Sequence, residues 1–304
     1  MRRSVPLPFV LLATSALAAV PAPERALTDP MSISSPANPQ ATPVPIADLF
    51  YTRSNPGSAW SPDGREVVFS TNFSGRYNLW KVDAAGGWPI QLVQSDDRQF
   101  GMTWSPDGRW IVFQSDRAGG ELYALFAVPA EGGPLVALTN DADATHEDAQ
   151  FSPDGTLIAF ERKSKTASAN DVAVLDWKTH AIRQLTHEST KDHYWQVAFW
   201  SRDGRSIYAN RFNAGGTDAS AWRVDVATGK TEELTPHAKA AMIAANGISP
   251  DGRWLAVQSN AKDGHDQAAL FDLDRHAYRW MTSGPWSTDW RRGRAGRPAC
   301  RLRG

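Results

Sequence analysis

The sequence predicts an all-β fold, a β-propeller of four-stranded blades with five complete repeat units and the start of a sixth. Three observations support this prediction. Glycines ending five Ser-Pro-Asp-Gly-type tetrapeptides are 44, 47, 49 and 48 residues apart, and such steps match the length of a propeller blade. Each unit has four short apolar segments with turn signals between them. No long stretch has helical periodicity. The tetrapeptides lie at 61–64, 105–108, 152–155, 201–204 and 249–252.

The first two strands of each unit flank the tetrapeptide. An apolar residue precedes it in every copy: Trp60, Trp104, Phe151, Trp200 and Ile248. A β-rich run follows it: Val67-Val68-Phe69, Ile111-Val112-Phe113, Ile158-Ala159-Phe160, Ile207-Tyr208-Ala209 and Leu255-Ala256-Val257. The tetrapeptide itself predicts a tight hairpin, because Pro presets φ, Asp bonds nearby backbone and Gly supplies a positive φ. Arg202 replaces Pro in the fourth copy, which such a turn tolerates.

Two more strands complete each unit. The third is predicted from segments such as Leu79–Val82, Val172–Leu175, Trp222–Val224 and Leu270–Leu273. The fourth is predicted at Gln91-Leu92-Val93, Ala137-Leu138-Thr139, Gln184-Leu185-Thr186, Glu233-Leu234-Thr235 and Trp280-Met281-Thr282. A metal site built from the five tetrapeptide Asp residues is the alternative to a turn, and a turn explains all five at once.

The N-terminal 46 residues differ from the repeats. Residues 1–18 are typical of a cleaved secretory signal, with Arg2 and Arg3 before an apolar run and Ala16-Leu17-Ala18 as a cleavage site. An uncleaved N-terminal anchor is the alternative, although the apolar run is short for a bilayer span. Residues 19–46 contain seven prolines and predict a flexible tether.

Charge and cysteine content exclude two classes of protein. Residues 1–18 and 291–304 hold eight of the 32 basic residues and no acidic ones, so the body carries 24 basic against 33 acidic side chains, near −9. Without a basic stripe, a nucleic-acid partner is not expected. Cys300 is the only cysteine, so no internal disulfide forms and stability comes from packing.

The repeat has a recognisable sequence pattern: Trp-Ser-Pro-Asp-Gly, then a run like Ile111–Arg117, then Gly132-Gly133 and Ala137-Leu138-Thr139. This pattern resembles the TolB-type, WD40-like (PD40) β-propeller repeat over residues 47–290. Periplasmic TolB proteins use it, and so does the N-terminal propeller of the prolyl oligopeptidase (S9) family of serine peptidases. TolB proteins carry a small α/β domain before the propeller, whereas only the predicted signal and tether precede the repeats in this sequence. This difference favours the resemblance to the peptidase family.

The resemblance to S9 peptidases implies an α/β-hydrolase domain after the propeller, with its serine in a G-x-S-x-G turn. No serine of this sequence has that flanking pair of glycines. Residues 291–304, where a sixth repeat is due, instead hold six Arg among Gly, Ala and Pro. We therefore expect a truncated or frameshifted S9-type peptidase with an aberrant Arg-rich tail. A natural basic tail that binds an acidic surface is the alternative.

Four sets of side chains have residue types that could form a site. Asp141, Asp143, His146, Glu147 and Asp148 could bind a divalent cation, but they lack EF-hand spacing and predict a solvated acidic loop. His187, Ser189, Asp192 and His193 occupy the equivalent loop of the next unit and lack a strained nucleophile turn. Trp60, Trp104 and Trp200 predict packing between blades rather than a carbohydrate platform. Arg117, Arg162 and Arg211 either face a substrate in the tunnel or are surface charges.

The sequence therefore predicts no catalytic, cofactor-binding or metal-binding residues and no enzymatic activity for this chain. Its expected role is that of a non-catalytic propeller resembling the substrate-gating N-terminal domain of an S9-type serine peptidase. A standalone TolB-like periplasmic scaffold that binds proteins is the alternative. The expected partners are peptides or proteins, without nucleic acid. After signal cleavage we expect no membrane span and a periplasmic or secreted location.

Overall fold

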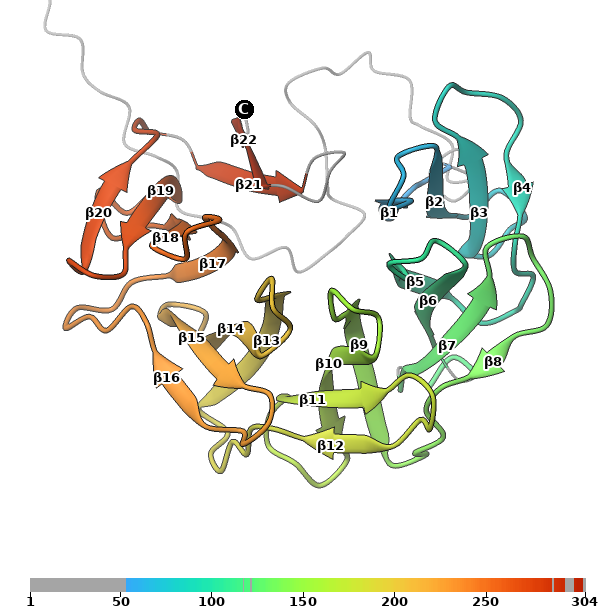
Figure 1. Ribbon diagram of the computed structural model, residues 1–304, viewed down its shortest axis with the longest axis horizontal. Coiled ribbons are helices and arrows are strands. Elements are labelled where there is room, and N and C mark those ends of the chain that lie inside the picture. Colours follow the sequence, from blue (N-terminus) through green and yellow to red (C-terminus); the bar gives the residue numbers. More distant parts are fainter. Residues whose placement is uncertain (1–52, 117, 121, 286, 293–297, 303–304) are drawn as a thin grey trace, which may run out of the picture. The chain divides into compact units, whose positions relative to one another are not determined.

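The computed structural model describes residues 53–116, 118–120, 122–285, 287–292 and 298–302 (Figure 1). The predicted signal at 1–18, the predicted tether at 19–46 and Arg117 lie outside these ranges. Arg53 begins the compact unit that contains all the described strands. Among the described residues there is no helix with the length and apolar character of a bilayer span.

Five antiparallel sheets of four strands each confirm the predicted propeller blades. The first two blades consist of β1 (Gly57–Trp60), β2 (Glu66–Thr71), β3 (Asn78–Asp83) and β4 (Ile90–Gln91), then β5 (Gln99–Trp104), β6 (Trp110–Ser115), β7 (Ala124–Pro129) and β8 (Val136–Ala137). The third consists of β9 (Ala144–Phe151), β10 (Leu157–Ser164), β11 (Asp171–Asp176) and β12 (Ile182–Gln184).

The fourth and fifth blades follow the same strand order. They consist of β13 (His193–Trp200), β14 (Ser206–Asn213), β15 (Ala219–Asp225) and β16 (Thr231–Glu233), then β17 (Ile243–Ile248), β18 (Trp254–Ser259), β19 (Gln267–Asp272) and β20 (Ala277–Trp280). Within this unit, β1, β5, β9, β13 and β17 are the innermost strands (Figure 1). The chain then forms a two-stranded sheet of β21 (Thr288–Arg292) and β22 (Pro298–Leu302), where the sixth unit was predicted to start.

The hydrophobic core is divided into four clusters, one between each pair of successive blades. The cluster between blades three and four, for example, joins Val172 and Val174 of β11 to Trp195, Val197 and other residues of the next blade. Because both faces of these sheets are covered, the middle strands are almost continuously buried, as in β11. Adjacent blades therefore stabilise each other through apolar burial.

The predicted tetrapeptide turn is confirmed in all five copies. The glycine has φ between 70° and 75° and its N–H bonds the serine carbonyl, as from Gly108 to Ser105 at 2.9 Å. The Asp carboxylate accepts the N–H two residues later, as from Arg109 to Asp107 at 3.0 Å. Sequence reasoning missed the serine, whose hydroxyl donates to the Asp and accepts the N–H five residues later, as between Ser105 and Trp110 at 2.9 Å.

The predicted fourth strands are displaced. Each strand ends directly before the last two residues of the predicted segment, which are Leu-Thr in the second, third and fourth units, as β12 ends at Gln184. The Leu and Thr instead fold over the third strand: the N–H of Leu185 bonds the carbonyl of Val172 at 2.8 Å, and the hydroxyl of Thr186 accepts the N–H of Val172 at 2.9 Å. The sequence predicted a strand through Leu185 because it is apolar, but Leu185 is buried by folding over the third strand. We call this pair of residues, Leu185 and Thr186 and their equivalents, the Leu-Thr latch.

Candidate functional site

The acidic group predicted in one loop is divided by the structure. Asp141 and Asp143 lie in the connection before β9, whereas His146, Glu147 and Asp148 belong to β9 itself, so the prediction of a single loop was wrong. Asp141 pairs with Arg162 at 2.5 Å and Asp143 with Lys165 at 2.9 Å. Within the described ranges, no three His, Cys, Asp or Glu side chains converge as metal ligands.

The second group is also partly in a strand, because His193 is the first residue of β13. His187 contacts Gln184 through Nδ1 at 3.4 Å, and no hydrogen bond within the described residues joins His187, Ser189 and Asp192. Arg162 and Arg211 form ion pairs with Asp141 and with Glu188, the latter at 2.8 Å, so both are held by their own blade or its connection.

The tryptophans before the turns differ between blades. Trp104 is buried and its indole N–H donates to the carbonyl of Ala59 in the preceding blade at 3.1 Å. Trp200 makes the same bond to Gln150 at 3.0 Å. These two pack between blades as predicted, whereas Trp60, in the first described blade, is 38% exposed.

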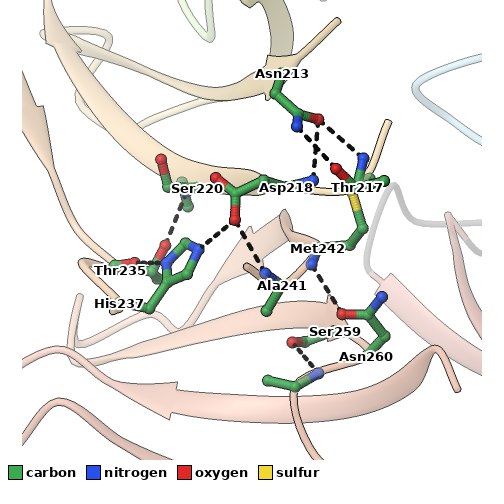
Figure 2. Close-up of polar contacts among 12 residues, drawn as sticks. Asn213, Thr217, Asp218, Ser220, Thr235, His237, Ala241, Met242, Ser259 and Asn260 are labelled. Carbon is green, nitrogen blue, oxygen red and sulfur yellow. Dashed lines mark hydrogen bonds and ion pairs between the residues drawn. The ribbon is translucent and has the colours of Figure 1, made fainter. Parts of the chain in front are cut away.

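An Asp–His pair fixes the connection between the fourth and fifth blades (Figure 2). His237 contacts the carbonyl of Thr235 through Nδ1 at 2.7 Å and Asp218 through Nε2 at 3.0 Å. Asp218 also accepts the N–H of Ala241 at 2.9 Å. Burial lowers the pKa of His237, but the bonds to Thr235 and Asp218 outweigh it and raise the pKa. When His237 is protonated, both imidazole nitrogens donate, and neither is then available as a base.

A cavity of about 530 Å³ is lined by residues of the fourth and fifth blades and by Ser287, and its volume is within the usual range of ligand pockets. Five carboxamides line it, and we call them the carboxamide cavity residues: Gln196, Asn210, Asn246, Gln258 and Asn260. Phe212 and Met242 add apolar surface. Asn260 accepts the N–H of Met242 at 2.8 Å, which leaves its amide nitrogen for a ligand (Figure 2). The side chain of Gln196 makes no hydrogen bond within the described residues, so the cavity offers both donors and acceptors.

Sequence reasoning also missed a repeated polar position. The sixth residue after each turn glycine is polar in all five units, and we call it the bridge position: Ser70, Gln114, Glu161, Asn210 and Gln258. It could have been found by aligning the units, because each copy follows directly on the apolar run of the second strand. Glu161 is the acidic copy; burial, followed by the charge of Asp148, raises its pKa to about 8.

Comparison with known proteins supports the fold. A family model described as the TolB beta propeller domain matches residues 46–198, half of the chain. TolB from Acinetobacter baumannii is 19% identical with a TM-score of 0.52, over 77% of this chain and 53% of that chain. A protein described as TolB from Agrobacterium tumefaciens is 20% identical with a TM-score of 0.57, over 83% and 90% of the two chains.

A peptidase has a similar fold over part of its length. Prolyl oligopeptidase B from Galerina marginata, bound to a 35mer substrate, is 12% identical with a TM-score of 0.59 over 80% of this chain and 36% of that chain. This chain thus spans about half of the Acinetobacter TolB and about a third of the peptidase. No curated protein sequence matches it.

Proposed function

The chain belongs to the TolB β-propeller domain family, and from that premise we propose that it is a non-catalytic module that binds peptides, as the substrate-gating propeller of an S9-type serine peptidase. The carboxamide cavity carries this proposal, because its side chains can donate to and accept from main-chain amides. We assign no activated nucleophile to the cavity, because no histidine is among the described residues that line it.

In this proposal each part of the chain has its own role. Residues 1–18 direct export to the periplasm or the medium, residues 19–46 are a tether, residues 47–290 are the propeller, and residues 291–304 take no part in binding. No catalytic, cofactor or metal residue is assigned. Peptide hydrolysis would require an α/β-hydrolase domain, a fold that the described residues do not contain.

A TolB-like periplasmic scaffold is the second candidate, and the description of the matching family favours it. A scaffold of this kind would bind the surface of a folded protein partner, whereas a gating propeller admits extended peptides. The two candidates therefore differ in the folded state of the ligand.

Separated insulin B chain and intact insulin test this difference, because they share a sequence and differ in folding. Fluorescence anisotropy with labelled B chain should show saturable binding. Unlabelled intact insulin should not displace the labelled B chain. Binding of intact insulin with equal affinity, or no binding of B chain, would refute the gating role. A fluorophosphonate probe should label no serine, because none is activated.

A further inference from the structure

The bridge position has one repeated task in the first four blades. Its side chain reaches across to the main chain of the next innermost strand. Ser70 donates to the carbonyl of Gln99 at 2.6 Å, and Gln114 accepts the N–H of Asp148 at 2.9 Å. Because the contacted groups belong to the backbone, a side chain at the bridge position can bind an extended segment of any amino-acid sequence.

The fourth copy shows this recognition most completely. Asn210 accepts the N–H of Ala245 at 2.8 Å and its amide nitrogen lies 3.4 Å from the carbonyl of the same residue. One carboxamide therefore contacts both the main-chain donor and the main-chain acceptor of one strand residue. A glutamine at the same position has the same pair of groups on a side chain that is one methylene longer.

The fifth copy, Gln258, has no such strand partner in the part of the chain that the structure describes. Its amide nitrogen donates to Asp266 at 3.2 Å, and its side-chain oxygen makes no hydrogen bond among the described residues. It lines the carboxamide cavity instead, and Ser287, next to β21, lies on the rim. Gln258 in the fifth blade thus presents to the cavity the same chemical group that Asn210 in the fourth blade uses to bind a strand.

We propose that the carboxamide cavity binds an extended, uncharged peptide segment, whose main-chain N–H donates to Gln258 and whose neighbouring peptide groups bond Gln196. This inference rests on the proposed function and names the site at which the peptide binds. The two glutamines lie on equivalent faces of successive blades, because Gln196 pairs with Asn210 across β13 and β14, and Ala244 pairs with Gln258 across β17 and β18. Both line the cavity.

The lining selects against other small ligands. The described lining contains no lysine or arginine, so it offers an anion no ion pair. A saccharide would use the carboxamides as well, but the internal repeats show these side chains holding main-chain amides in strand geometry. An extended peptide is therefore the ligand that fits both the chemistry and the repeat.

The test uses a labelled heptapeptide that copies residues 242–248, the strand that Asn210 holds, together with the same peptide N-methylated at its central alanine, the equivalent of Ala245. N-methylation removes one donor and keeps every side chain. We expect the N-methyl peptide, and the variants Gln258→Ala and Gln196→Ala, to weaken binding by about tenfold each, the effect of one lost hydrogen bond. The exposed Gln94, which lines a different surface pocket, supplies the matched control Gln94→Ala, which should bind normally.

The outcomes separate this inference from the proposed function. If insulin B chain binds but its affinity is unchanged by Gln258→Ala and Gln196→Ala, and N-methylation has no effect, the cavity is not the site while peptide binding stands. If neither peptide nor B chain binds, both ideas fail. Displacement of the heptapeptide by maltopentaose would identify a saccharide site instead and overturn the inference. Thermal unfolding of each variant verifies that the fold is retained.

Discussion

Glu161 on β10 accepts a hydrogen bond from the backbone N–H of Val197 on β13 at 3.2 Å, in a position where 5% of its surface is exposed. It is a carboxylate at a position that glutamine occupies in the second and fifth blades. Burial disfavours its charged form, and the nearby Asp148 adds repulsion, so the pKa of Glu161 rises to about 8.

The raised pKa makes folding pH-dependent. A carboxyl has an unfolded pKa near 4.3, so between about pH 4.3 and 8 the folded state binds the extra proton and the free energy of unfolding falls as pH rises. Glu161→Gln should therefore stabilise the protein at pH 8.5 by on the order of 2 to 4 kcal/mol, and change little at pH 4.5. Urea unfolding at the two pH values measures this.

The reverse substitution is the matched control. Gln114 accepts the N–H of Asp148 in the second blade, as Glu161 accepts that of Val197 in the third. Gln114→Glu should introduce a pH-dependent loss of stability at a position where the unchanged protein has no ionisable side chain. Equal effects of Glu161→Gln at pH 4.5 and pH 8.5 would contradict a buried carboxyl with a raised pKa.

His237 gives a pH dependence of its own. Its pKa is raised in the folded state, so its bonds to Asp218 and Thr235 add stability that is fully present below the unfolded pKa near 6.5 and is lost as pH rises through the folded value. His237→Ala should lower the melting temperature more at pH 5.5 than at pH 9. His265, which is exposed near the β18–β19 turn, provides the control His265→Ala. A decrease that is the same at both pH values would show that the imidazole acts only by packing.

Much of the fold could be predicted because its repeated signals are local. Asp107 and Gly108 act within one turn, so their residue types and spacing specify their geometry. The bridge position was missed because Glu161 and Asn210 act on a strand more than thirty residues away, and one unit read alone shows only a polar residue after an apolar run. The cavity was missed for the same reason, since Gln196 and Gln258 line one cavity only because their blades pack together.

The turn serine should contribute measurably to stability. The hydroxyl of Ser105, which is 4% exposed, donates to Asp107 at 2.6 Å and accepts the N–H of Trp110. The bond from Ser105 is the main reason that the pKa of Asp107 is lowered to about 2. Ser105→Ala leaves a donor unsatisfied, and should lower the free energy of unfolding by about 1 to 3 kcal/mol. Urea unfolding of the exposed-site variant Ser58→Ala should match the unchanged protein; equal losses in both variants would refute this role.

The last prediction concerns the hydroxyl of Thr186 in the Leu-Thr latch. Thr186 is 3% exposed, accepts the N–H of Val172 at 2.9 Å and donates to Asp171 at 2.8 Å. Thr186→Val keeps the volume and removes both bonds, which leaves a buried donor and a carboxylate without that partner. The free energy of unfolding should fall by about 1 to 3 kcal/mol.

A substitution in the first blade serves as the control for the effect of the Thr186 hydroxyl. There Val93 stands at the latch position, and the N–H of Leu79, equivalent to that of Val172, donates to Gln99 at 3.3 Å instead. Val93→Thr should therefore change the free energy of unfolding far less than Thr186→Val, because the donor it would satisfy already has an acceptor. Urea unfolding of both single variants decides this, and a loss at Thr186 no larger than the change at Val93 would mean that the third strand is held without a contribution from the Thr186 hydroxyl, by the main-chain bonds and the packing of Leu185.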